Sequence, residues 1–109
     1  MAGASIVGGM NNNSEITHVF FLRGSTQYTA IGSSAFMNAK KLQEIILPDS
    51  ITSIGANAFQ SADSLININL HDNITEIGSN AFSATVMDDM KVNISKLPAN
   101  LIVLGSGAF

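Results

Sequence analysis

The chain has 109 residues, of which 46% are hydrophobic and 12% are charged, and its formal net charge is −3. This composition excludes a disordered tail, which needs low hydrophobicity and high net charge. The five basic residues are scattered, so we expect neither a nucleic-acid footprint nor a polybasic membrane patch. Because the chain has no cysteine, a disulfide framework, a thiol nucleophile and a cysteine-based zinc site are excluded.

The first segment, residues 1–14, consists of small residues and a run of asparagines. It is predicted to be a flexible arm or linker, with docking on a neighbouring subunit as the alternative. No basic residue precedes Arg23, so a secretory signal peptide is not expected in this sequence. The longest apolar runs have the length of a strand, and we therefore predict no membrane insertion.

From residue 15 onward the chain is organised by a recurring block, Ile/Leu-Gly-x-x-Ala-Phe. Its four copies occupy residues 31–36, 54–59, 77–82 and 104–109, so the first two steps between copies are equal and the last is longer. A fixed period of this length indicates a repeat solenoid whose turns stack on one another. We predict a strand-dominated solenoid over residues 15–109, with about three and a half to four turns and irregular or short helical returns. The longer last step predicts an insertion within residues 83–91.

Each unit contains a strand pattern followed by a corner. Ile45 and Leu47 are separated by one residue, which is the period of a strand with one buried face. Pro48 and Asp49 end this strand, since proline offers no ladder donor and aspartate favours turns. Gly55 permits a positive φ at the next corner. The predicted core consists of Leu42, Ile45, Leu47, Ile51, Ile54, Phe59, Leu65, Ile68, Leu70, Ile74, Ile77 and Phe82.

The first unit is less regular than those that follow. Counting back one repeat period from the second unit places Val19 at the position of Leu42 and Gly24 at the position of Leu47. The first turn is therefore predicted to be degenerate. Atypical first units are expected, because a terminal turn has a neighbour on one side only.

At these repeats the sequence resembles the BspA-like class of leucine-rich repeats, whose unit runs roughly LxxIxLPxxIxxIGxxAFxxCxxL. The resemblance covers about residues 19–109, although Ala39, Ala62 and Thr85 stand where the family often has cysteine. It implies a curved solenoid with strands on its concave face. Such repeats occur in bacterial surface adhesins, some protist surface proteins and some phage proteins. The resemblance also implies binding to other macromolecules rather than catalysis.

The outward positions of the strands are the candidate binding surface, because this is where a solenoid of this kind binds. A mixed apolar and polar strip suits a protein or glycan partner. The alternative is an ordinary strand face, or one covered by the N-terminal segment. Counting by the repeat period also aligns Phe20, Gln43 and Ile66 with one another, as one column of outward positions in successive repeats. The candidate partner-binding residues are Phe21, Arg23, Glu44, Ile46, Asn67, Asn69 and Lys96.

The two histidines do not indicate a catalytic or metal site. His71 stands in a turn beside Asp72, and His18 precedes the first strand. Neither has a third ligand at a recognisable spacing or a nucleophile elbow nearby. We interpret them as solvated histidines and predict no enzyme activity, no metal and no cofactor. Asp88 and Asp89 are interpreted as part of a solvated loop, because the calcium-loop pattern is missing.

Two hypotheses for the function follow from these patterns. The first is a non-catalytic interaction or adhesion module of a larger cell-surface or extracellular protein, which binds a macromolecule on the concave strand face. The second is a structural subunit of an assembly, such as a phage virion component or a filament. This alternative depends on the N-terminal arm and on the sequence stopping at Phe109, where we expect an inward ring and no polar cap. An open strand edge there would invite stacking of further subunits or copies of the chain.

Overall fold

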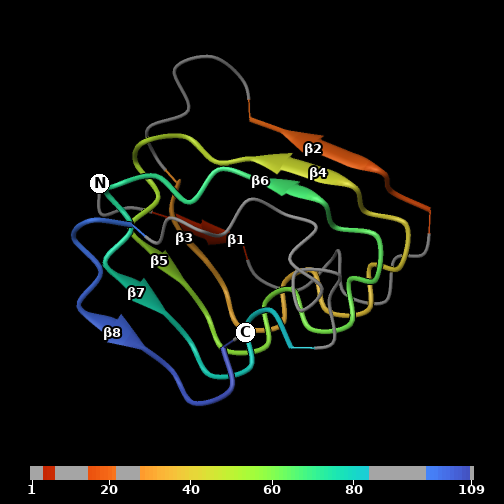
Figure 1. Ribbon diagram of the computed structural model, residues 1–109. Helices are drawn as coiled ribbons and strands as arrows, with labels where there is room; N and C mark the ends of the chain where they lie inside the picture. The colour runs from red at the N-terminus through yellow and green to blue at the C-terminus, as the bar shows by residue number, and fades with distance from the viewer. Residues whose placement is uncertain (1–3, 7–14, 22–27, 84–97, 109) are drawn as a thin grey trace.

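The computed structural model describes residues 4–6, 15–21, 28–83 and 98–108. These residues form short β-strands in two parallel sheets, and no helix is found among them. Figure 1 shows the two sheets on different sides of the molecule. The five-stranded sheet contains β1 (Ala4–Ile6), β3 (Tyr28–Ile31), β5 (Ser53–Ile54), β7 (Glu76–Ile77) and β8 (Val103–Leu104), in that order. The three-stranded sheet contains β2 (His18–Phe20), β4 (Glu44–Ile46) and β6 (Asn67–Ile68).

Successive repeats lie side by side in register. Ile54 pairs with Ile31 on one side and with Ile77 on the other, which are the same position in neighbouring repeats. In the second sheet Ile45 pairs with Ile68 in the same way. Parallel strands need a long connection between them, and here each connection is the remainder of one repeat. The regular step between the recurring blocks therefore predicts these pairings correctly.

The first repeat differs from its predicted alignment. Val19 pairs with Ile45 and Phe20 with Ile46, which is an i to i+26 relation, whereas Ile45 and Ile68 follow the regular i to i+23 relation. The alignment that placed Val19 at the position of Leu42 is therefore wrong. Ile16, Val19 and Phe21 take the inward positions of this turn, where all three are partly buried against the core. Residues 22–27, where the excess occurs, lie outside the described part of the chain.

Strand β1 lies inside the segment that the sequence predicts to be a flexible arm. Its Ser5 pairs with Ala30 and its Ile6 with Ile31, in parallel and with one irregularity after Ala4. Residues 4–6 therefore extend the five-stranded sheet by one strand beyond the first repeat. For these residues the structure differs from the expectation of a free arm.

The returns between the sheets are chains of hydrogen-bonded turns. Ala35 N–H bonds to the carbonyl of Gly32 within one turn, at 3.2 Å, whereas Phe36 N–H bonds to the carbonyl of Ala58 in the next repeat, at 2.7 Å. This alternation satisfies the backbone without a helix, although short helical returns were an alternative expectation. Equivalent places in successive returns have positive φ, at Ser34, Asn57, Asn80 and Gly107.

The glycine that follows the buried isoleucine has a different role from the one predicted. Among the described glycines only Gly107 has a positive φ, so the prediction of a left-handed corner at Gly55 is wrong. A Cβ added to Gly55 would lie 2.6 Å from the backbone nitrogen of Ser33, and one added to Gly78 would lie 2.4 Å from that of Ala56. These glycines are therefore needed because consecutive turns approach closely at this corner.

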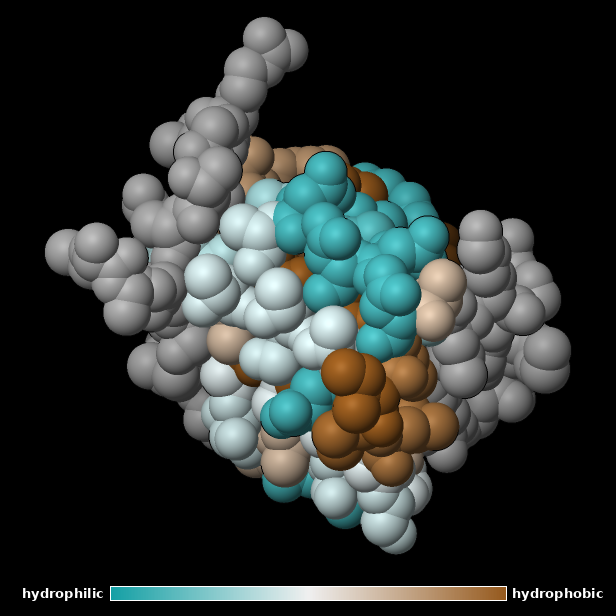
Figure 2. Space-filling view, turned by 90° about the vertical axis from the view of Figure 1, so that its left-hand side faces the viewer, coloured by the Kyte–Doolittle hydropathy of each residue, from teal (hydrophilic) through white to brown (hydrophobic). Residues whose placement is uncertain are grey.

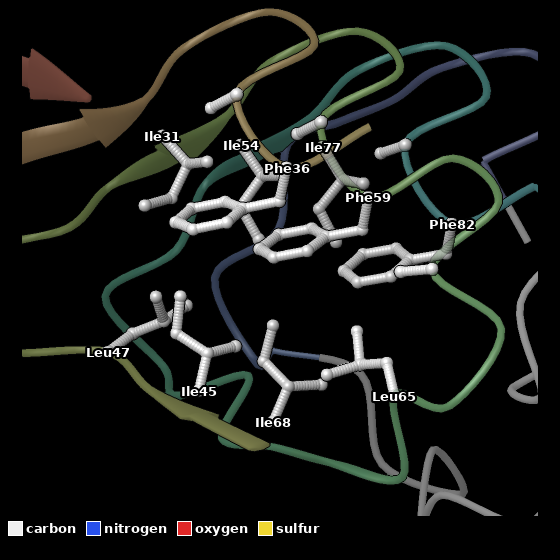
Figure 3. Close-up of a cluster of buried hydrophobic side chains, with 14 of the residues drawn as sticks. Ile31, Phe36, Ile45, Leu47, Ile54, Phe59, Leu65, Ile68, Ile77 and Phe82 are labelled. Atoms are coloured by element: carbon white, nitrogen blue, oxygen red, sulfur yellow. The ribbon is translucent and has the colours of Figure 1, made fainter. Parts of the chain in front are cut away.

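The core is a set of ladders that run through the stacked repeats (Figure 3). Phe59 stacks between Phe36 and Phe82, with ring centroids 5.3 Å apart on both sides and nearly parallel planes. Small residues such as Ala58 are fully buried beside the rings. Of the expected core residues, only Leu70 is half-buried rather than buried. Because each ladder spans several turns, the repeats stabilise one another.

Candidate protein-interaction surface

The outward positions of β2, β4 and β6 form one face of the three-stranded sheet, which we call the outer strand surface. Inward-facing Ile45 and Ile68 alternate with these outward positions, as the strand period requires. Phe20 is 63% exposed and Ile66 is 50% exposed, which is unusual for side chains of this size. The outer strand surface consists of the outward strand residues His18, Phe20, Glu44, Ile46 and Asn67, together with the exposed residues Thr17, Gln43 and Ile66 that directly precede the three strands.

The apolar part of this surface lies across the two strands β2 and β4. Phe20 is the register partner of exposed Ile46. The His18 ring stacks on Phe20, with ring centroids 6.1 Å apart and an interplanar angle of 15°. The Nδ1 atom of His18 is hydrogen-bonded to Oγ1 of Thr17 at 2.9 Å. His18 and Phe20 therefore form one aromatic pair next to an aliphatic side chain.

The polar part of the surface is ordered by contacts between neighbouring repeats. Glu44 is the register partner of both His18 and Asn67. The side-chain amide of Asn67 donates a hydrogen bond to the Glu44 carboxylate. Because both side chains already hold one geometry, less side-chain entropy is lost when a partner contacts them.

Asn69 does not belong to this surface, although the sequence placed it there. Its Oδ1 accepts a hydrogen bond from the backbone N–H of Leu47 at 2.6 Å, and its Nδ2 donates one to the Leu47 carbonyl at 2.9 Å. Strand β6 ends at Ile68, so the side-chain amide continues the pairing where the backbone pairing stops. Asn69 is thus a structural residue that is half-buried between two repeats.

Three other candidate residues are placed differently or lie outside the description. Phe21 is half-buried against the core and meets the ring of Tyr28 edge-on, with centroids 5.7 Å apart and planes at 63°. It therefore packs inward rather than facing solvent. Arg23 and Lys96 lie outside the described residues. Glu44, Ile46 and Asn67 do lie on the outer strand surface.

His18 was absent from the candidate residues, and Phe20 was placed in the column of Gln43 and Ile66, because the first repeat was aligned with the wrong spacing. The missed signal is Ile16-x-x-Val19-x-Phe21, which reproduces the Leu-x-x-Ile-x-Leu pattern of the later repeats. With this alignment, the residues on either side of Val19 are the outward ones. His18 and Phe20 then fall in the columns of Glu44 and Ile46.

His71 connects two repeats and is not the solvated turn histidine that the sequence suggested. Its Nε2 donates to the carbonyl of Pro48 at 2.9 Å, and its Nδ1 accepts from the backbone N–H of Asn73 at 3.2 Å. In this arrangement Nε2 is the donor of the ring and Nδ1 is its acceptor. Both ring nitrogens are therefore occupied by backbone groups. Across residues 4–6, 15–21, 28–83 and 98–108, no cluster of three or more His, Cys, Asp or Glu side chains is close enough to hold a metal ion.

The five-stranded sheet presents a different outer face. Thr52 and Thr75 donate their hydroxyls to the carbonyls of Thr29 and Thr52 in the preceding turns, at 3.3 and 3.2 Å. These hydroxyls reinforce the turn-to-turn pairing.

No helix in the described part of the chain is long and apolar enough to cross a membrane.

Comparison with known families matches the BspA type leucine rich repeat region, in six copies, over residues 11–109. Neither the curated proteins nor the solved structures gave a match to this chain. The matched region includes both sheets from β2 onward and the returns between them. Leucine-rich repeats generally mediate protein interactions. Since the match covers nearly the whole sequence, the chain belongs to the BspA-type leucine-rich repeat family.

Proposed function

We propose that this chain is a non-catalytic module that binds a macromolecular partner, in the first place a protein, on its outer strand surface. The observation that carries the proposal is the exposure of Phe20 and Ile46 on the same sheet face as the ordered Glu44–Asn67 pair, with exposed Ile66 directly before β6. Protein interfaces combine a well-packed apolar centre, often aromatic, with a polar rim. The surface supplies both elements within one short sheet.

The repeat architecture supports this role through rigidity. The parallel registers and the stacked phenylalanines favour a short solenoid of about three and a half to four turns, whose strand surface is preorganised for binding. We infer that the module acts in adhesion or recognition at a cell surface or outside the cell, as part of a larger protein. A glycan is the alternative partner.

The proposal is tested by screening the chain against panels of extracellular proteins and glycan arrays, followed by measurement of each Kd by biolayer interferometry. The double variant Phe20→Ser/Ile46→Ser should weaken binding at least about 30-fold, because truncating a central interface side chain costs about 2 kcal/mol or more. Ile102→Ser is the matched control, since Ile102 is an exposed isoleucine beside the other sheet. Binding that survives the double variant would refute the assignment of this surface.

A further inference from the structure

The outer strand surface is organised as two rows that run across its strands. The first row contains His18, Glu44 and Asn67, which are register partners on β2, β4 and β6. The second row contains Phe20 and Ile46, which lie two residues further along β2 and β4. Residues two apart in a strand are separated by about 6.6 Å. A polar row and an apolar row therefore run side by side at this distance.

The polar row presents a negative charge and hydrogen-bond acceptors. The side-chain amide of Asn67 donates to Oε2 of Glu44, whereas Oε1 of Glu44 has no partner in the described part of the chain. Glu44 also forms no ion pair with any described residue. Because Asn67 directs its amide nitrogen toward Glu44, its Oδ1 is a second acceptor in the same row. This arrangement matches a positively charged group that carries several donors.

The apolar row matches the rest of such a side chain. Phe20 is 63% exposed and Ile46 is 36% exposed, so both offer carbon surface to a partner. The His18 ring stacks on Phe20 and brings aromatic surface up to the polar row. Arginine has an apolar methylene stem and a planar guanidinium that stacks on aromatic rings and donates up to five hydrogen bonds. Its two parts therefore correspond to the two rows.

We propose that the outer strand surface binds an arginine side chain presented by a protein partner, an inference that rests on the proposed function. The stem of the arginine packs on Phe20 and Ile46, and its guanidinium donates to Oε1 of Glu44 and to Oδ1 of Asn67. The net charge of −3 favours the approach of a basic segment. A glycan is the competing partner, but a neutral sugar leaves the charge of Glu44 unmatched.

Selection from a phage-displayed library of short random peptides tests the arginine requirement without a known partner. Peptides selected on the parent chain should contain arginine several times more often than the unselected library. In a selected peptide, replacement of this arginine by lysine should raise the Kd at least about tenfold, because the ammonium group neither stacks on the rings nor reaches two acceptors in one plane. A selection that yields no arginine-containing binder overturns the proposal, and so does binding of a glycan array without such peptides.

Two glutamate variants locate the charge that the arginine-containing peptide contacts. Glu44→Gln should raise the Kd of the peptide about tenfold, because a hydrogen bond to a charged group becomes one to a neutral group. Glu76→Gln makes the same change in net charge and should leave the Kd unchanged, since Glu76 is an exposed residue on β7 of the other sheet. Figure 2 views the side on which β7 and β8 lie in Figure 1, where a hydrophilic patch also borders a hydrophobic cluster. The control therefore samples a surface of similarly mixed character, and equal effects of the two variants would overturn the proposal.

The same measurements separate this inference from the proposed function on which it rests. If Phe20→Ser/Ile46→Ser abolishes binding of a partner while Glu44→Gln leaves it unchanged, the outer strand surface is the binding site and the arginine inference is wrong. If the double variant binds as tightly as the parent chain, the assignment of the surface is itself wrong. Circular dichroism of Glu44→Gln should match that of the parent chain, because Glu44 contacts only the exposed Asn67 side chain through its carboxylate in the described contacts. A loss of binding in this variant then reports the contact and not the fold.

Discussion

The side-chain amide of Asn69 forms two hydrogen bonds with the backbone of Leu47, one to its N–H at 2.6 Å and one to its carbonyl at 2.9 Å. The amide therefore bonds to its neighbour as a peptide group does in a ladder. It does so one residue after β6 ends at Ile68, where Leu47 would otherwise have to find other partners. Leu47 itself is buried in the core, so its polar groups need a partner within the protein.

Asn69→Ala is expected to lower the free energy of unfolding by about 2 kcal/mol, because it leaves two backbone groups of buried Leu47 without partners. Chemical denaturation followed by circular dichroism measures this change. Asn67→Ala is the matched control in the same repeat, since exposed Asn67 bonds only to the Glu44 side chain through its own side chain in the described contacts. It should cost less than about 0.5 kcal/mol. Equal losses in the two variants would contradict the structural role of Asn69.

Gly78→Ala is expected to destabilise the protein by about 3 kcal/mol or to prevent folding, because the new methyl group has no space. The Cβ would lie 2.4 Å from the backbone nitrogen of Ala56 and 2.7 Å from the carbonyl carbon of Gly55. Both atoms belong to the backbone of the preceding turn, so the two turns would have to separate. Thermal unfolding checks this, with Ser79→Ala at the exposed neighbouring position as the control. A Gly78→Ala protein with an unchanged Tm would show that the turns can move apart at little cost.

The sequence predicts the stacking of regular repeats well, because pairing in a stack follows directly from the period. Residues one period apart, such as Ile54 and Ile77, are register partners. Period alone fails where a repeat changes length, and so the longer offset between Phe20 and Ile46 was missed. The pattern of the strand itself, read from Ile16 to Phe21, contained the information.

The candidate surface was only partly predictable for a further reason. Alternation assigns a residue to the outward side, but it does not say which group the side chain contacts. Asn69 occupies an outward position by the repeat pattern and yet turns back to Leu47. Likewise, the sequence shows that residue 55 is a glycine, but not that the backbone of the preceding turn lies too close to Gly55 for a Cβ. Both facts depend on contacts between repeats rather than on any one repeat.

Ser34→Asn is expected to stabilise the protein by about 0.5 kcal/mol, because asparagine tolerates the left-handed conformation better than serine. Ser34 has a φ of 60°, and the equivalent residues Asn57 and Asn80 have φ values of 60° and 59°. Denaturation midpoints measure the gain. The reciprocal variant Asn57→Ser should lose a similar amount. If the two substitutions do not shift stability in opposite directions, backbone conformation is not what selects asparagine at this corner.

Phe59→Ala is expected to cost about 3–5 kcal/mol, because it removes a fully buried ring from the middle of the core. Since small domains have a total stability of about 5–15 kcal/mol, much of the protein should unfold at moderate temperature. Ser53→Ala, on the outer side of β5, should change little.

Phe59 stacks on rings on both sides, whereas Phe36 stacks on Phe59 alone within the described contacts. Phe59→Ala should therefore exceed Phe36→Ala by about 0.5–1.5 kcal/mol, the value of one aromatic pair. Urea denaturation of both variants measures the difference, and equal losses would mean that the stack adds nothing beyond the burial of each ring.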